Sequence, residues 1–169
     1  MIQKITPFLW FDKEAEDAAK FYTSIFSGSA SGGKNSKIGS VSRYGKEGFE
    51  VHKMPEGTAM VVEFELEGQK FSALNGGPVF KFNESISFLV SCETQEEVDY
   101  YWNKLSAVPE SGQCGWLKDR FGLSWQIVPN ALGELMSDPD PAKAGRVMNA
   151  MLKMKKLDIA DLKKAYENK

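Results

Sequence analysis

The chain has 169 residues, 42% of them hydrophobic and 26% charged, with a formal net charge of −2. This length and composition are typical of one globular domain, or of two small modules that share a sheet. The slightly negative net charge does not indicate a nucleic-acid-binding surface, and no apolar run is long enough to span a membrane. Because the first residues do not resemble a signal peptide, we expect a cytoplasmic protein.

The N-terminal segment predicts a strand, a helix and a loop. Residues 5–11 favour a strand, with Pro7 near its start or at an edge. Asp12 is the expected N-cap of a helix over 13–26, where apolar residues recur at helical spacing. Residues 27–36 are a Gly- and Ser-rich loop.

Three strands complete the first half. The first runs from Ile38 to Tyr44. The segments 59–66 and 69–75 flank Glu67-Gly68, which predicts a hairpin with a tight turn. The first half therefore has the order β-α-β-β-β.

The second half repeats this order in a shorter form, with one strand lost or reduced. Residues 85–91 predict a strand, and Thr94 begins a helix with Glu97 as its capping-box partner. Two further strands are expected at 115–119 and 123–129.

The last part of the chain predicts a helical tail. Residues 139–168 favour two short amphipathic helices, split near Leu157-Asp158. We expect them to pack on the sheet or on a partner chain.

Several kinds of catalytic site find little support. The chain has one histidine, His52, in a stretch typical of a surface loop, so sites that need two imidazoles are excluded within one chain. Its two cysteines, Cys92 and Cys114, are expected to be small buried apolar residues. The segment Gly28-x4-Gly33-Lys34-Asn35 partly resembles a phosphate-binding loop. It follows a predicted helix instead of a strand, and it has Asn35 where such a loop needs Ser or Thr after the lysine.

Four segments resemble one family. They are ITPFLWFD-x-x-AEDAAKFY-x-x-IF, ALNGGPVFKFNESISFLV, TQEEVDYYW-x-KL and LKDRFGLSWQIVP. Together they are similar to the PhnB-like, demethylubiquinone methyltransferase-like branch of the glyoxalase/bleomycin-resistance/dioxygenase (vicinal oxygen chelate) superfamily. The resemblance covers almost the whole chain, 3–168.

The resemblance implies an α+β fold. We expect two β-α-β-β-β modules, the second shortened, whose curled antiparallel or mixed sheets surround a cleft. The modules would span 3–78 and 84–130 of a domain at 3–130, followed by a helical extension at 131–169. Relatives often assemble as dimers, so we also expect a homodimer.

The resemblance also implies that the usual metal site is absent. Metalloenzymes of the superfamily place His and Glu ligands at four positions, which correspond here to Thr6, Asn75, Ser85 and Gln126. Neutral oxygen and amide groups bind transition metals far more weakly than imidazole and carboxylate do. We therefore expect no bound metal and no other cofactor.

A cleft that holds a small apolar ligand is the leading hypothesis. Thr6, Phe8 and Trp10 share one face of the first strand by period-two alternation. The amides of Asn75 and Gln126 would orient a polar end of the ligand. The expected lining is completed by Ser85, Phe88 and Trp125. However, Trp125 alternates with Gln126, and Phe88 with Ser85 and Ser87, so both fit a core position as well.

Two other hypotheses stay open. The chain could be an enzyme that uses other carboxylates or no cofactor, with Glu63 and Glu65 as the nearest acids, although their alternation also fits a solvent-facing side of a strand. It could also be a dimeric interaction module that works through its Met-bearing tail. No catalytic residue is assigned.

Overall fold

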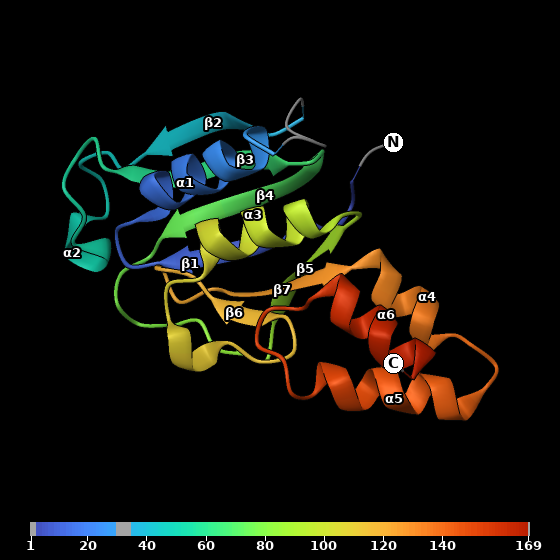
Figure 1. The fold of residues 1–169 in the computed structure, drawn as a ribbon. Helices are drawn as coiled ribbons and strands as arrows, with labels where there is room; N and C mark the ends of the chain where they lie inside the picture. Colours follow the sequence, from blue (N-terminus) through green and yellow to red (C-terminus); the bar gives the residue numbers. More distant parts are fainter. Residues whose placement is uncertain (1–2, 30–34, 169) are drawn as a thin grey trace. The chain divides into compact units, whose positions relative to one another are not determined.

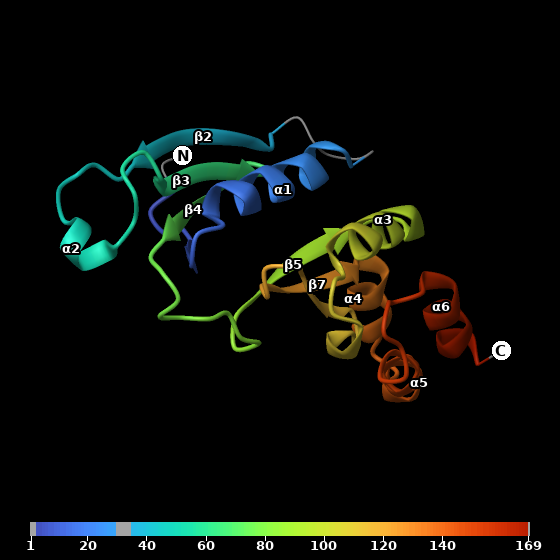
Figure 2. The same ribbon diagram turned by 90° about the vertical axis from the view of Figure 1, so that its left-hand side faces the viewer.

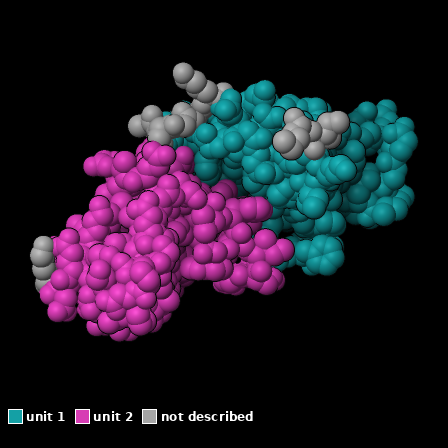
Figure 3. Space-filling view, turned by 90° about the vertical axis from the view of Figure 1, so that its right-hand side faces the viewer, with its two compact units in different colours: residues 1–82 teal, residues 83–169 magenta. Residues whose placement is uncertain are grey.

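The computed structural model describes residues 3–29 and 35–168, so the glycine-lysine segment at 28–35 lies largely outside the described residues. The chain divides into two compact units, Met1–Phe82 and Asn83–Lys169, called unit 1 and unit 2 below (Figure 3). The described residues form seven strands in two separate mixed sheets, together with helices. The α+β class predicted from the sequence is confirmed.

Unit 1 holds a four-stranded sheet with one long helix. Its sheet has the order β1-β4-β3-β2, in which β1 runs parallel to β4 and the other pairs are antiparallel. The predicted hairpin is confirmed, and both Glu67 (φ 47°) and Gly68 (φ 81°) have the positive φ that a type I′ turn requires. In chain order the elements are β1 (Phe8–Phe11), α1 (Ala15–Ser27), β2 (Lys37–Arg43), α2 (Phe49–His52), β3 (Ala59–Leu66) and β4 (Gln69–Asn75).

Unit 2 repeats this arrangement with one strand fewer. Its sheet has the order β5-β7-β6, with β5 parallel to β7 and β6 antiparallel to β7. These three strands correspond to β1, β4 and β3, and the described residues contain no counterpart of β2. The elements are β5 (Ser87–Cys92), α3 (Gln95–Leu105), the 3-10 turn η1 (Pro109–Ser111), β6 (Trp116–Lys118), β7 (Ser124–Pro129), α4 (Asn130–Met136), α5 (Pro141–Met151) and α6 (Ile159–Glu167).

Two predicted strands begin two or more residues later than expected. β1 begins at Phe8, after Pro7, which has no N–H to donate to the sheet. β5 begins at Ser87, because Ser85 lies in a turn where its N–H and hydroxyl donate to Asn83 Oδ1 at 3.0 and 2.5 Å. Thr94 is the N-cap of α3 as predicted, since its Oγ1 accepts the N–H of Glu97 at 3.3 Å. The Glu97 carboxylate accepts the N–H of Glu93 at 2.6 Å and not that of Thr94, so the predicted capping box is only partly formed.

The first sheet has one face under α1 and an opposite face on which the described residues of unit 1 place no long helix. Figures 1 and 2 show α1 along one side of β2, β3 and β4. Val62, Phe64 and Phe71 point to this side and are buried, and Phe64 packs against Tyr22 of α1. Since side chains alternate along a strand, their neighbours lie on the opposite side. We call that side the open face, and it carries Phe8, Trp10, Val61, Glu63, Glu65, Lys70, Ser72 and Leu74.

The N-terminus of α1 is capped by a residue from the far end of the unit. The predicted cap was Asp12, but α1 begins at Ala15, and the N–H of Ala15 donates to Asn75 Oδ1 at 2.8 Å. The Nδ2 group of Asn75 donates to the carbonyl of Ala59 at 2.9 Å, and the Asn75 carbonyl accepts the hydroxyl of Tyr44 at 2.6 Å. Asn75 is 1% exposed. One side chain thus joins α1 to the start of β3.

The two glycines after Asn75 both contact the indole ring of Trp10. A Cβ at Gly76 would lie 2.3 Å from the indole Cζ2, so only glycine leaves room for the ring there. The indole N–H donates to the carbonyl of Gly77 at 2.8 Å. Phe80 then meets Trp10 edge to face, with ring centroids 4.9 Å apart. The Gly-Gly-Pro joint therefore folds back over β1.

The tail contains one more helix than predicted and packs within unit 2. The short α4 follows directly after Pro129, and the split before Asp158 is confirmed because Asp158 caps α6. The side chain of Gln95 in α3 donates to the carbonyl of Leu157 at 3.2 Å and accepts the N–H of Ile159 at 2.8 Å. These bonds attach the tail to α3 of the same chain.

Replacing Asn75 with Ala should destabilise unit 1. The change leaves the Ala15 N–H and the Ala59 carbonyl buried without their partner, which costs on the order of 2–4 kcal/mol in free energy of unfolding. Urea unfolding followed by circular dichroism measures this loss. Asn103→Ala, at an exposed position of α3, is the control and should change stability little. Equal stability of the two variants would contradict the capping role of Asn75.

Replacing Gly76 with Ala should displace the Trp10 ring. A methyl group 2.3 Å from the indole cannot be accommodated without movement, and we expect a loss of about 1–3 kcal/mol together with a changed tryptophan emission. Gly133→Ala is the matched control, because a Cβ at Gly133 meets no atom within 4 Å and Ala suits a helix better. An unchanged emission spectrum in Gly76→Ala would show that the ring is not held there.

Candidate functional site

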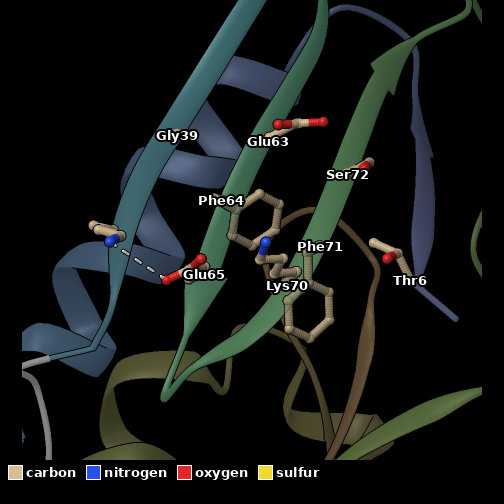
Figure 4. Close-up of a pocket in the computed structure, with 9 residues that line it drawn as sticks. Thr6, Gly39, Glu63, Phe64, Glu65, Lys70, Phe71 and Ser72 are labelled. Carbon is tan, nitrogen blue, oxygen red and sulfur yellow. Dashed lines mark ion pairs between the residues drawn. The ribbon is translucent and has the colours of Figure 1, made fainter. Parts of the chain in front are cut away.

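A hollow of about 210 Å³ lies on the open face of the first sheet (Figure 4). It is bordered by β2, β3 and β4 and by Thr6, which lies two residues before β1. Its lining is mostly polar and contains two carboxylates, two ammonium groups and two hydroxyls. The residues are Thr6, Lys37, Gly39, Glu63, Phe64, Glu65, Lys70, Phe71 and Ser72.

An irregularity in β2 shapes this hollow. The register between β2 and β3 shifts between Ile38 and Val41, which is a bulge. Gly39 lies in this bulge, and a Cβ there would come within 3.2 Å of the carbonyl oxygen of Glu63. Because Gly39 has no side chain, the space beside Glu63 is not filled from β2.

The charged groups in the hollow are unequally paired. Lys37 Nζ lies 3.7 Å from Glu65 Oε2, the ion pair drawn as a dashed line in Figure 4. Glu63 Oε2 accepts a hydrogen bond from the hydroxyl of Ser40 at 2.9 Å. Among the described residues, no cationic group lies within 4.0 Å of the Glu63 carboxylate, and no carboxylate lies within 4.0 Å of Lys70 Nζ. The hollow thus presents one negative and one positive charge without an ion-pair partner.

An aromatic group lies on the same face of the sheet. Phe8 is opposite Ser72 in the register, and Trp10 is opposite Leu74. Phe8 is 59% exposed and Phe80 is 62% exposed. The open face therefore combines exposed aromatic rings with the polar hollow, which is the composition expected of a small-molecule site.

The structure separates the predicted residues of unit 1 into two groups. Thr6, Phe8 and Trp10 belong to the open face, as alternation predicted, and Thr6 borders the hollow. Asn75 lies opposite Phe11, on the face covered by α1, and its amide is engaged in the two buried hydrogen bonds described above. Asn75 therefore does not adjoin Phe8 and Trp10.

The predicted residues of unit 2 also divide between two faces. Phe88 lies opposite Trp125 in the register, with ring centroids 5.6 Å apart, and Trp125 is 2% exposed. Gln126 lies on the other face, where its amide donates to the hydroxyl of Ser87 at 2.9 Å. Ser85 precedes the strand. The single cleft lined by residues of both units stays a prediction.

A comparison with protein families identifies the chain. A model of the 3-demethylubiquinone-9 3-methyltransferase family matches residues 3–128. The chain belongs to this family. The match ends before α4, so the helical tail α4–α6 lies beyond the part that the family shares.

One solved structure agrees with this membership, and a second shares the fold. A putative 3-demethylubiquinone-9 3-methyltransferase, PhnB protein, from Bacillus cereus is 37% identical over 75% of this chain and 99% of its own, with a TM-score of 0.59. A protein from Pseudomonas aeruginosa is 15% identical over 76% of this chain and 98% of its own, with a TM-score of 0.52. No curated protein matches the chain. The predicted PhnB-like, demethylubiquinone methyltransferase-like membership is confirmed.

The four residues that the resemblance assigns to metal positions, Thr6, Asn75, Ser85 and Gln126, do not fit a transition metal. None is His or carboxylate, the Asn75 amide is occupied, and Gln126 is bonded to Ser87. In the described part of the chain, no three His, Cys, Asp or Glu side chains are grouped so that they could hold a metal ion. The described helices also include none with the length and apolar content to cross a membrane.

The histidine and the cysteines are not among the residues that line the hollow. His52 Nδ1 accepts the N–H of Met54 at 3.0 Å, and its ring packs on Tyr44. Burial, with Glu97 nearby, raises the pKa of the Cys92 thiol to about 12, so this thiol stays protonated and is a poor nucleophile. Cys114 is only half-buried, which corrects the expectation that both cysteines are core residues.

Sequence reasoning did not find Lys37, Gly39, Lys70 and Ser72. It considered Glu63 and Glu65 only as the nearest acids. The alternation in VVEFELE and QKFSALN places both carboxylates, Lys70 and Ser72 on one face once the hairpin register is known. The part played by Gly39 depends on the bulge, which has no clear signal in the sequence.

Replacing Asp119 with Asn tests whether Trp125 is a structural residue. Asp119 Oδ2 accepts the indole N–H of Trp125 at 2.8 Å, and Oδ1 accepts the N–H of Phe121 at 2.8 Å and of Leu123 at 3.1 Å. An amide would point an N–H group at one of these donors, so we expect a loss of about 1–3 kcal/mol in urea unfolding. Asp17→Asn, at an exposed position of α1, is the control and should change stability much less. Unchanged stability of Asp119→Asn would contradict this role.

Proposed function

We propose that the chain binds a small organic molecule on the open face of its first sheet, without a metal ion. The main support for this proposal is that a polar hollow and exposed aromatic rings lie on the same face of the sheet. An apolar body of a ligand would lie against Phe8 and Trp10. A polar end would reach the groups around Thr6 and Ser72.

In a ligand pocket, apolar and polar side chains contribute to binding in different ways. Aromatic side chains remove apolar surface of the ligand from water, and a few polar groups fix its orientation. The backbones that carry the carboxylates and ammonium groups of the hollow are fixed in neighbouring strands of a sheet, so only the side chains lose conformational entropy when they contact a ligand. Such binding requires no catalytic group.

Methyl transfer is the second candidate, because the family description names a methyltransferase. This chain has no glycine-rich G-x-G-x-x-G segment of the kind that holds a dinucleotide or adenosyl-methionine in a Rossmann fold. We therefore rank binding first. Saturable binding of S-adenosylmethionine to the purified protein, with methylation of an added phenol, would reverse this order.

Assembly as a homodimer and a cytoplasmic location remain proposals that rest on the sequence. A small-molecule function is compatible with both. The third hypothesis, an interaction module that works through the tail, loses its main support because α5 and α6 pack on each other and Gln95 attaches the tail to α3.

Replacing Phe8 with Ala should weaken the binding of planar aromatic compounds. Phe8 is exposed on the open face, and loss of one ring contact corresponds to about 0.5–1.5 kcal/mol, or roughly a two- to tenfold higher Kd. A panel of such compounds is titrated against tryptophan fluorescence in chelator-treated buffer. Phe49→Ala is the matched control, because Phe49 lies in α2 and is 46% exposed.

Two results would contradict the proposal. One is an unchanged Kd in Phe8→Ala for every compound that binds the unmodified protein. The other is binding that disappears in chelator-treated buffer and returns when a divalent metal is added.

A further inference from the structure

We propose that the hollow recognises a small zwitterion, a molecule with an ammonium group and a carboxylate or similar anion, through Glu63 and Lys70. This inference rests on the proposed function and names the class of its ligand. It concerns the polar hollow and not the aromatic side of the open face. Figure 4 shows Glu63 on β3 and Lys70 on β4, with Ser72 and Thr6 beside them.

The carboxylate of Glu63 is available to a cationic group. Its only hydrogen bond partner in the described structure is the hydroxyl of Ser40, which donates to one of its two oxygens. A carboxylate has room for several further donors. Since Gly39 leaves the neighbouring space unfilled, an ammonium group can approach Glu63 from the hollow.

The ammonium group of Lys70 is available to an anionic group. In the register Lys70 lies directly opposite Glu65. That carboxylate instead has Lys37 at 3.7 Å, and Lys70 Nζ has no carboxylate within 4.0 Å among the described residues. The backbone of Lys70 is fixed by the side chain of Gln3, which accepts its N–H at 3.0 Å and donates to its carbonyl at 3.1 Å. The base of the Lys70 side chain is thus held in place.

The two charges are diagonal neighbours on the sheet. Glu63 pairs with Ser72, and Lys70 precedes Ser72 by two residues on β4. Diagonal neighbours are roughly 7–8 Å apart, a separation that long side chains can bridge. Glu63 and Lys70 form no ion pair with each other in the described structure, so a ligand with a charge at each end could contact both. Ser72 and Thr6 add hydroxyls to the lining of the same hollow.

The charge balance of the hollow favours a zwitterion over a simple anion or cation. Glu63, Glu65, Lys37 and Lys70 sum to zero at neutral pH. A ligand with one charge satisfies one free group and is repelled by the other. A ligand with both charges satisfies both, and two weak contacts in one molecule act together.

A series of linear ω-amino acids tests this proposal. Glycine, β-alanine, 4-aminobutanoate and 6-aminohexanoate are added to ¹⁵N-labelled protein, and binding is followed by shifts of the amide signals of β3 and β4. Butylamine and butanoate are the singly charged comparisons. Because both protein charges are exposed, we expect Kd values in the millimolar range, tightest for one intermediate length and at least about threefold weaker for the singly charged compounds.

Charge variants locate the contacts. Glu63→Gln and Lys70→Gln should each raise the Kd of the preferred amino acid by about threefold to fivefold. The double reversal Glu63→Lys/Lys70→Glu should restore binding relative to either single reversal, because the zwitterion can turn around. Glu134→Gln and Lys153→Gln, at exposed positions of unit 2, are the matched controls.

The outcomes separate this inference from the proposed function. Equal affinity for butylamine, butanoate and the amino acids would overturn the zwitterion proposal, as would shifts that are unaffected by both single variants. If no amino acid binds but the binding of aromatic compounds is still weakened by Phe8→Ala, the zwitterion proposal is wrong and the proposed binding on the open face is retained. If neither set binds, both proposals fail.

Discussion

The side-chain amide of Asn75 is the constraint on which unit 1 depends. It satisfies the first free N–H of α1 and the carbonyl at the start of β3, in a position almost without solvent. A helix end that is buried without such partners would lose much of its stability. By fixing α1 over one side of β3 and β4, Asn75 also decides which side of the sheet is left open. The candidate site therefore follows indirectly from a residue that does not belong to it.

The three residues Asn75, Gly76 and Gly77 together hold α1 and the Trp10 side chain in place. Asn75 holds the helix, Gly76 makes room for the indole of Trp10, and the Gly77 carbonyl accepts the indole N–H. Three consecutive residues thereby connect β4 to α1 on one side of the sheet and to β1 on the other. Each of the three residues therefore has a structural role, although two of them are glycines without side-chain chemistry.

The second unit uses the same strand order with different means of support. It lacks the counterpart of β2 among the described residues, and its helical tail begins just after the part shared with the family. Residues just after α5 bond to the segment before β6, where the N–H groups of Cys114 and Gly115 donate to the carbonyls of Met154 and Lys155 at 2.8 Å. Gln95 of α3 fixes the start of α6 in the same way. The tail is thus an integral part of unit 2.

The sequence by itself determined the class of the fold, the repeated order of strands and helices, and the family, because these depend on local periodicity and on short motifs. It also placed Thr6, Phe8 and Trp10 on one face, since alternation along a strand needs no tertiary information. The role of Asn75 could not be read in this way: its partners Ala15 and Ala59 lie 60 and 16 residues away. The hollow beside Glu63 and Lys70 was likewise decided by the pairing register and by the bulge at Gly39. Register and bulges are set by contacts between strands, and only the tertiary structure fixes those contacts.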